Sequence, residues 1–257
     1  MVHDKSWKYV FENPRIFRDF IHSYFNTDLA RSIVPGSMLS INPEFIHKGE
    51  LRHSVSDIIY KTACHFKDSM KKPLDVYFII EFQSTVDSAM DRRLLLYAHH
   101  LSKRITRSQN AKNDYRIITL VIYTCSGAPM LGADPRTLDF QTPPSAGFQI
   151  SPYLQINIDT FSNDELISVG GVLSAIMYIE NIGSIKDYSK ETIAILKDMI
   201  QNESAENKEV LYEWISIRFY GTITKDETKK LFAGRRLAPP ARHAAGWYIL
   251  RRQKLCW

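Results

Sequence analysis

Residues 75–84 read DVYFIIEFQS, an apolar run that ends in a glutamate and a glutamine. Its aromatic and β-branched side chains are typical of a buried β-strand. Glu81 and Gln83 are two residues apart, so in a strand both side chains point to the same side of the sheet. An ionised carboxylate is costly to bury unless a positive charge lies beside it. The run therefore indicates either a structural ion pair at a strand end or a metal-binding edge of an active site.

The segments around this run predict an α/β fold with a mixed sheet as its core. Apolar side chains recur at helical spacing on both sides of Asn13-Pro14, which predicts one or two N-terminal helices. Residues 52–66 are rich in β-branched and aromatic side chains and predict a strand antiparallel to 75–84. Residues 87–107 present apolar side chains on one helical face, and residues 115–124 form a further apolar strand.

The composition changes along the chain and predicts four segments. Residues 1–125 form the α/β core. Residues 126–161 are rich in Gly, Pro and Ser and predict a linker, in which residues 151–161 could add one strand. Residues 162–233 have helical periodicity and predict a smaller C-terminal lobe. Residues 234–257 form an atypical basic tail, interpreted either as a frame-shifted gene end or as a tail that contacts DNA.

The net charge of +5 is unevenly distributed. Residues 1–124 carry 18 Lys and Arg against 13 Asp and Glu, residues 125–233 carry 9 against 15, and residues 234–257 carry 6 against none. A basic first half suits contact with phosphates, although a solvated surface of mixed charge has a similar composition. The charge pattern is compatible with DNA as a partner but does not establish it.

The cysteines and the hydropathy indicate an ordinary reducing compartment. Cys64, Cys125 and Cys256 are odd in number and widely spaced, which supports neither a disulfide framework nor a CxxC metal site. No stretch approaches the roughly 18 apolar residues of a membrane span, and the N-terminus lacks the apolar core of a signal peptide. We therefore expect a cytoplasmic protein without a membrane partner.

Two carboxylates and one amide form the candidate site. Asp57 lies in one predicted strand and Glu81 ends the next, so the two side chains can face each other. Carboxylate oxygens are ligands that Mg²⁺ prefers, and a bound cation lowers the pKa of a coordinated water and offsets charge on a scissile phosphate. Gln83 can position water or phosphate through its amide but cannot supply the charge of a lysine. This set of residue types is that of a Mg²⁺-dependent nuclease.

The same acidic residues also have a structural interpretation. Asp57 could cap the end of a strand. Glu81 could form a salt bridge with Arg92, Arg93 or Lys61. Spacing alone leaves both interpretations open.

The chain resembles a known family in several blocks. Asp57 followed by Glu81-Phe82-Gln83 resembles the D…ExK signature of the PD-(D/E)XK nuclease superfamily, with glutamine in the lysine position. The blocks are HDKSWKYVFENP at residues 3–14, ELRHSVSDIIYK at 50–61, IIEFQS at 79–84, MDRRLLLYAHHL at 90–101 and LVIYTCSG at 120–127. In this order, over about residues 3–220, they resemble the recombination-promoting nuclease/putative transposase family of bacteria.

The resemblance implies a restriction-endonuclease-like fold and Mg²⁺-dependent DNA endonuclease activity, with Mn²⁺ as an alternative ion, linked to recombination or mobile DNA. It implies that Asp57 and Glu81 are metal ligands and catalytic residues, and that Gln83 takes the lysine position. Glu50 is a further acidic candidate for the metal site.

DNA is the expected partner. Arg92, Arg93 and Lys103 are the candidate phosphate contacts on the helix that follows the glutamate, although ordinary surface charge explains them equally well. A homodimer is compatible with the sequence but is not indicated by any motif. The alternative function is a catalytically inactive DNA-binding or protein-interaction module on the same fold, which Gln83 in the lysine position and the atypical tail at residues 234–257 leave open.

Overall fold

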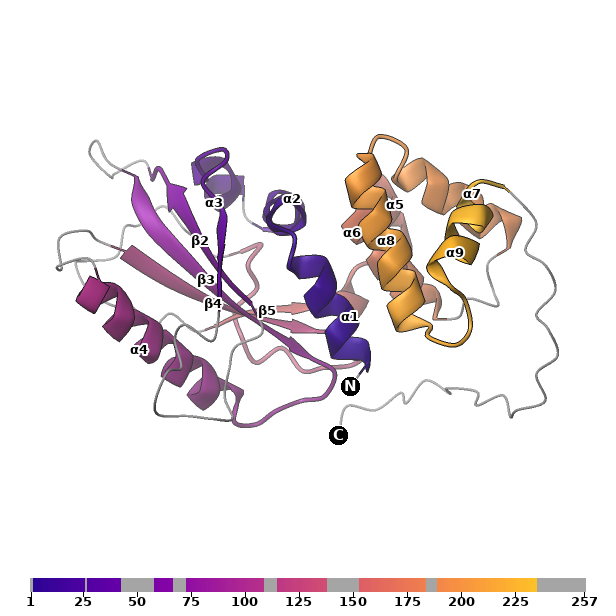
Figure 1. Ribbon diagram of the computed structural model, residues 1–257. Helices are drawn as coiled ribbons and strands as arrows, with labels where there is room; N and C mark the ends of the chain where they lie inside the picture. Colours follow the sequence, from indigo (N-terminus) through magenta and orange to yellow (C-terminus); the bar gives the residue numbers. More distant parts are fainter. Residues whose placement is uncertain are drawn as a thin grey trace. The chain divides into compact units, whose positions relative to one another are not determined.

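The computed structural model describes most of the chain as two compact units (Figure 1). The described residues are 2–25, 27–42, 58–66, 73–108, 115–137, 153–183 and 189–234. The sheet unit comprises the described residues from Phe11 to Ile158. The helical unit comprises residues 2–10 together with the described residues from Asp159 onward.

The sheet unit contains a five-stranded mixed sheet in the order β1-β2-β3-β4-β5. Its elements are α2 (Pro14–Tyr24), α3 (Thr27–Ser32), β1 (Leu39–Ile41), β2 (Ile58–Cys64), β3 (Leu74–Gln83), α4 (Met90–Ser108), β4 (Tyr115–Tyr123) and β5 (Leu154–Asn157). β1, β2 and β3 are antiparallel neighbours, whereas β3, β4 and β5 run parallel. This arrangement confirms the expected α/β class, mixed sheet and antiparallel strand pair.

β3 is the central strand, and both of its faces are covered. Every residue from Val76 to Phe82 is buried. A strand that is buried on both sides has no need of polar alternation, which explains its continuous apolar sequence. Because successive side chains of a strand point to opposite faces, β3 supplies two separate cores.

The first core is aromatic and lies between β2, β3 and the N-terminal helical segment. Phe17 of α2 stacks on Tyr60 with ring centroids 4.8 Å apart and meets Phe78 edge-on at 5.3 Å. Phe11 contacts Phe82 at 5.2 Å, and the Tyr60 hydroxyl donates a hydrogen bond to the Phe11 carbonyl oxygen. These contacts fix α2 against the even-numbered side chains of β3.

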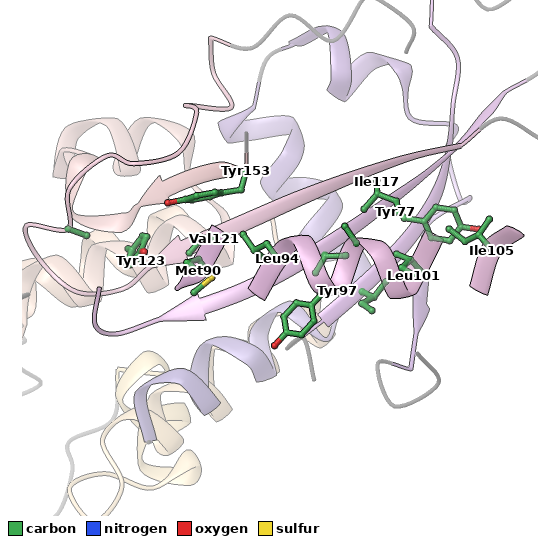
Figure 2. Close-up of a cluster of buried hydrophobic side chains, with 14 residues drawn as sticks. Tyr77, Met90, Leu94, Tyr97, Leu101, Ile105, Ile117, Val121, Tyr123 and Tyr153 are labelled. Carbon is green, nitrogen blue, oxygen red and sulfur yellow. The ribbon is translucent and has the colours of Figure 1, made fainter. Parts of the chain in front are cut away.

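The second core lies between the sheet and α4, which crosses over from β3 to the parallel strand β4 (Figures 1 and 2). Its buried members from α4 recur at three- and four-residue spacing, as the sequence predicted. They are Met90, Leu94, Tyr97, Ala98, Leu101 and Ile105. The odd-numbered side chains Tyr77 and Ile79 belong to the same cluster, so this face of β3 points to α4.

The helical unit begins with the N-terminal part of α1 (Val2–Phe11) and continues after β5. Its other helices are α5 (Asn163–Val169), α6 (Gly171–Ile182), α7 (Lys190–Met199), α8 (Ala205–Arg218) and α9 (Lys225–Phe232). Trp7 and Trp214 are both buried and meet edge-to-face with centroids 6.2 Å apart. This contact ties residues 2–10 to the C-terminal helices, an association that no periodicity in the sequence indicates.

Most of these helices begin at hydroxyl caps. Ser162, Ser189 and Ser204 each accept a hydrogen bond from the backbone N–H three residues later. Thr224 and Glu227 form a reciprocal capping box at the start of α9. Within the described ranges, every helix is too short or too polar to cross a lipid bilayer.

Replacing Phe17 with alanine tests the aromatic core. Phe17 is fully buried, so the cavity should cost about 3–5 kcal/mol of unfolding free energy. Leu95→Ala is the control because Leu95 is 42% exposed on α4, and its loss should cost about 0.5 kcal/mol. Urea denaturation followed by circular dichroism measures both. Equal effects of the two substitutions would contradict the packing of α2 on the sheet.

Candidate active site

Glu81 lies near the C-terminal end of β3 and faces α4. Its residue is 2% exposed, and it shares a face with Ile79, which belongs to the core beneath α4. In the parallel ladder Glu81 pairs with Val121 of β4, so a buried neighbouring strand lies beside it. The strand register therefore forces an ionisable side chain into an apolar layer, where it requires a compensating group.

Arg93 of α4 supplies that group. Its Nη2 lies 2.7 Å from Glu81 Oε2, and its Nη1 lies 2.8 Å from Asp87 Oδ2. Burial is the largest single influence and lowers the pKa of the guanidinium, but the charges of Glu81, Tyr97 and Asp87 and the hydrogen bond to Glu81 together raise this pKa above its usual value. Arg93 therefore stays cationic, and one guanidinium joins the two carboxylates. Of the three cations considered from the sequence as partners for Glu81, the structure selects Arg93.

Asp87 is a member of this cluster that the sequence did not single out. Its Oδ1 accepts a hydrogen bond from the Ala89 backbone N–H at 2.8 Å, just before α4 begins at Met90. Asp87 therefore holds the start of α4 with one oxygen and Arg93 with the other. An aspartate shortly before a helical apolar pattern is a recognisable start signal, but its bond to Arg93 depends on the tertiary fold.

Gln83 lies two residues beyond Glu81 on the same side of β3, about 7 Å further along the strand. Its carbonyl oxygen accepts a hydrogen bond from the Thr124 backbone N–H at 2.9 Å, which anchors the strand end. Among the described residues its side-chain amide forms no hydrogen bond, and the residue is only partly buried. The amide is thus available for a bound molecule.

Two tyrosines complete the surroundings of the cluster. Tyr123 pairs with Gln83 in the β3–β4 ladder, and burial, together with the charge of Asp87, raises the pKa of its hydroxyl. Burial raises the pKa of the Tyr153 hydroxyl to about 12, and the nearby Tyr123 and Asp91 add to the effect. Both hydroxyls are therefore neutral at physiological pH. Neither tyrosine is recognisable as a site residue from the sequence, because a tyrosine in an apolar segment carries no functional signal.

The other predicted site residues fall into two groups. Asp57 and Glu50 lie outside the described residues. Arg92 and Lys103 are exposed on α4, and neither is part of the Glu81 cluster. The structure therefore brings together Glu81 and Arg93 from the predicted set and adds Asp87.

Lys61, the third cation considered for Glu81, has a different partner. It pairs with Asp75 at 2.8 Å, close to the opposite end of β3. β3 thus carries one ion pair near each end, which supplies a matched control for experiments on Glu81.

The chemistry of the cluster fits a hard cation such as Mg²⁺ only in part. Carboxylate and amide oxygens of Glu81 and Gln83 are suitable donors. Within the described ranges, however, no group of three or more His, Cys, Asp or Glu side chains is placed to hold a metal ion. A metal site at Glu81 therefore requires a carboxylate from another part of the chain. Asp57 is the candidate expected from the sequence, because the residue after it, Ile58, pairs with Ile80 in the β2–β3 ladder. Asp57 itself lies outside the described residues.

Comparison with known proteins identifies one family. The sequence model described as "Putative transposase, YhgA-like" matches residues 1–207, which include the whole sheet unit and the start of α8. No curated protein and no solved structure matches the chain. The matched range contains Glu81, Gln83 and Arg93.

A double-mutant cycle tests the buried ion pair. Arg93→Met leaves the Glu81 carboxylate without its cation and should lower the unfolding free energy by about 3 kcal/mol. Adding Glu81→Gln removes the uncompensated charge and should restore most of this loss. Urea denaturation of the parent, the two single variants and the double variant gives the coupling free energy between Arg93 and Glu81. Strictly additive effects would contradict a buried pair.

Arg92→Met is the matched control for this cycle. Arg92 is the adjacent residue on α4 and is exposed. Its replacement should change the unfolding free energy by no more than about 0.5 kcal/mol. A loss as large as that of Arg93→Met would attribute the effect to the helix rather than to the ion pair.

Proposed function

Since the chain belongs to the YhgA-like putative transposase family, whose description connects it with mobile DNA, we propose that it is a metal-dependent endonuclease that hydrolyses phosphodiester bonds of DNA. The observation that carries the proposal is the buried Glu81 carboxylate, which is accompanied by hydrogen-bond donors without partners. These donors are the Gln83 amide and the buried Nε–H of Arg93, which forms no hydrogen bond in the described part of the chain.

A buried donor without a partner, such as the Arg93 Nε–H, is unusual in a purely structural cluster. Buried polar groups in folded proteins nearly always have a partner, and exceptions often mark a site for a ligand or an ordered water. A phosphate oxygen or a water molecule accepts hydrogen bonds from both an amide and a guanidinium. The unpaired donors beside Glu81 therefore support a site that takes a phosphodiester.

In the proposed site Asp57 and Glu81 would hold Mg²⁺ or Mn²⁺, with Glu50 as a further acidic candidate. When bound, the cation lowers the pKa of a water ligand and offsets the negative charge that builds on the scissile phosphate. Glu81 reaches this role from a central strand, so its position is set by the sheet rather than by a mobile loop.

The remaining roles belong to groups of the protein itself. Arg93 holds the Glu81 carboxylate in one orientation through its Nη2 and keeps that orientation fixed to the start of α4 through Asp87. Gln83 donates its amide N–H to a phosphate oxygen or to the attacking water. Because the amide is neutral, it orients these groups without the charge stabilisation that a lysine would add.

One observation favours the alternative, a catalytically inactive DNA-binding or protein-interaction module. Glu81 already has a short charged hydrogen bond to Arg93, as expected for a structural pair at a strand end. In that case the cluster would serve to dock α4, and the chain would bind DNA without cleaving it. Cleavage assays separate the two functions directly.

Glu81→Gln tests the catalytic role of the carboxylate. The substitution keeps the size of the side chain and an acceptor for Arg93 but removes the charge that a metal ion requires. Divalent-metal-dependent nicking of supercoiled plasmid should fall by more than the roughly 10–100-fold that loss of an outer-shell partner costs. Mg²⁺ and Mn²⁺ should both be assayed.

Asp75→Asn is the matched control, because it removes the charge of the other ion-paired carboxylate on β3. It should leave nicking within about twofold of the parent, because the partly exposed Lys61–Asp75 pair lies near the opposite end of β3 from Glu81. Equal loss in both variants would assign the effect to stability. No nicking by the parent protein would favour the inactive module.

Gln83→Ala and Gln83→Lys test the position beside Glu81. The alanine variant should be as stable as the parent, because the amide has no partner to lose, but it should cleave more slowly. The lysine variant should retain cleavage, because an ammonium also donates hydrogen bonds and adds positive charge. Nicking rates and melting temperatures of both variants measure this. An alanine variant that cleaves at the parent's rate would remove Gln83 from the mechanism.

A further inference from the structure

The outer surface of α4 carries a row of polar side chains that the proposed chemistry does not use. Arg92, His99, Lys103 and Arg107 are all exposed. They are spaced by seven, four and four residues, which is the repeat of one helical face. At 100° per residue they fall within an arc of about 80° and extend over about 22 Å of helix. We call these four residues the α4 stripe.

The α4 stripe lies on the side of the helix opposite to its buried face. Leu94, Leu101 and Ile105 are at most 5% exposed and pack on the sheet. On a helix with 3.6 residues per turn these positions are rotated by roughly 180–220° from Arg92. The sheet core therefore fixes the direction in which the stripe points, and the stripe is a rigid surface of the sheet unit.

The cations of the stripe have no acidic partners. Arg92, Lys103 and Arg107 form no ion pair or side-chain hydrogen bond within the described ranges. α4 contains five Lys and Arg but only one acidic residue, Asp91, which lies about 100° away from Arg92 around the helix. Surface cations of stable proteins commonly have opposite charges interspersed among them. A row without them attracts a polyanion.

We propose that the α4 stripe binds the phosphate backbone of duplex DNA. The inference deepens the proposed function and depends on it for the identity of the substrate. The three cations neutralise phosphates, and His99 adds an imidazole hydrogen-bond donor. Arg93, expected from the sequence to contact phosphate, is not part of the stripe, because its Nη2 and Nη1 bind Glu81 and Asp87. His99 and Arg107 are not among the phosphate contacts expected from the sequence.

The stripe begins next to the candidate active site. Arg92 is the neighbour of Arg93 and lies in the first turn of α4, whose start is held by Asp87. DNA that follows the stripe towards the N-terminal end of α4 is therefore led to the end of the sheet where Glu81 lies. Contacts of this kind position the duplex without reading its sequence. They should raise affinity and leave the chemical step unchanged.

An anionic membrane is the other polyanionic surface that a basic helix could bind. Helices that lie on membranes insert an apolar face between the lipids. The apolar face of α4 is already buried against the sheet, and only Leu95 and Leu96 are substantially exposed beside the stripe. Two partly exposed leucines provide little area for insertion, so the charge row fits DNA better than lipid.

The test is the salt dependence of binding to a fluorescein-labelled duplex in EDTA, where cleavage cannot occur. The triple variant Arg92→Gln, Lys103→Gln, Arg107→Gln should bind more weakly than the parent. The slope of log K against log salt should decrease in magnitude by about 2.7, or 0.9 for each lost phosphate contact. Between 50 and 200 mM salt, the affinity of the triple variant should therefore fall by about 40-fold less than the affinity of the parent.

The matched control is Arg31→Gln, Lys190→Gln, Lys230→Gln, which removes three exposed cations from other helices. It changes the net charge by the same amount. Its slope of log K against log salt should stay within about 0.9, the value of one phosphate contact, of the parent's slope. The inference is overturned if the α4 variant keeps the parent's slope, if both variants lose the same amount, or if the parent does not bind duplex DNA.

Two further measurements separate this inference from the proposed function. Binding of the parent to phosphatidylserine vesicles in preference to DNA, lost in the α4 variant, would make the stripe a membrane contact and overturn the inference. If the parent nicks plasmid, the α4 variant should raise KM and preserve kcat. If the parent does not nick, the slope in EDTA still decides whether the stripe binds DNA.

Discussion

A carboxylate buried at the end of a central strand needs a cation beside it, and this requirement organises the sheet unit. Glu81 is held between β3 and α4 and is bonded by Arg93 at 2.7 Å. Arg93 can reach it only if α4 packs on the sheet in one register. Asp87 stabilises the same register, because one of its oxygens binds Arg93 and the other binds the backbone at the start of α4. The ion pair and the apolar packing of α4 therefore specify the same arrangement.

The same helix then serves three purposes on three of its faces. Its apolar face closes the core beneath the sheet. Arg93, about 100° around from Arg92, points to the buried carboxylate. The opposite face carries the α4 stripe. Since the three faces belong to one rigid helix, the position of the stripe is fixed relative to Glu81, and a surface that recruits DNA would also align it with the candidate site.

Glu81 can meet a structural and a catalytic requirement with the same geometry. A metal ligand must be held in a fixed orientation, and an ion pair to Arg93 provides that orientation within the fold. A metal ion at Glu81 would share the carboxylate with the guanidinium, and each cation would make the other less favourable. The affinity for the metal would then depend on how firmly Arg93 holds its carboxylate. The free energy of packing α4 on the sheet and the free energy of metal binding would then depend on each other.

The sequence by itself determined the elements. A 3.6-residue period identified α4, because periodicity reflects which side of a helix is buried, and runs of apolar, β-branched and aromatic side chains identified β2, β3 and β4. The family was also recognisable from short blocks spread over residues 3–127. Only the tertiary structure decided the partners. It selected Arg93 for Glu81, added Asp87, and joined Trp7 to Trp214 across most of the chain. Sequence spacing cannot make such choices, because they depend on which side chains the folded backbone brings within a few ångströms.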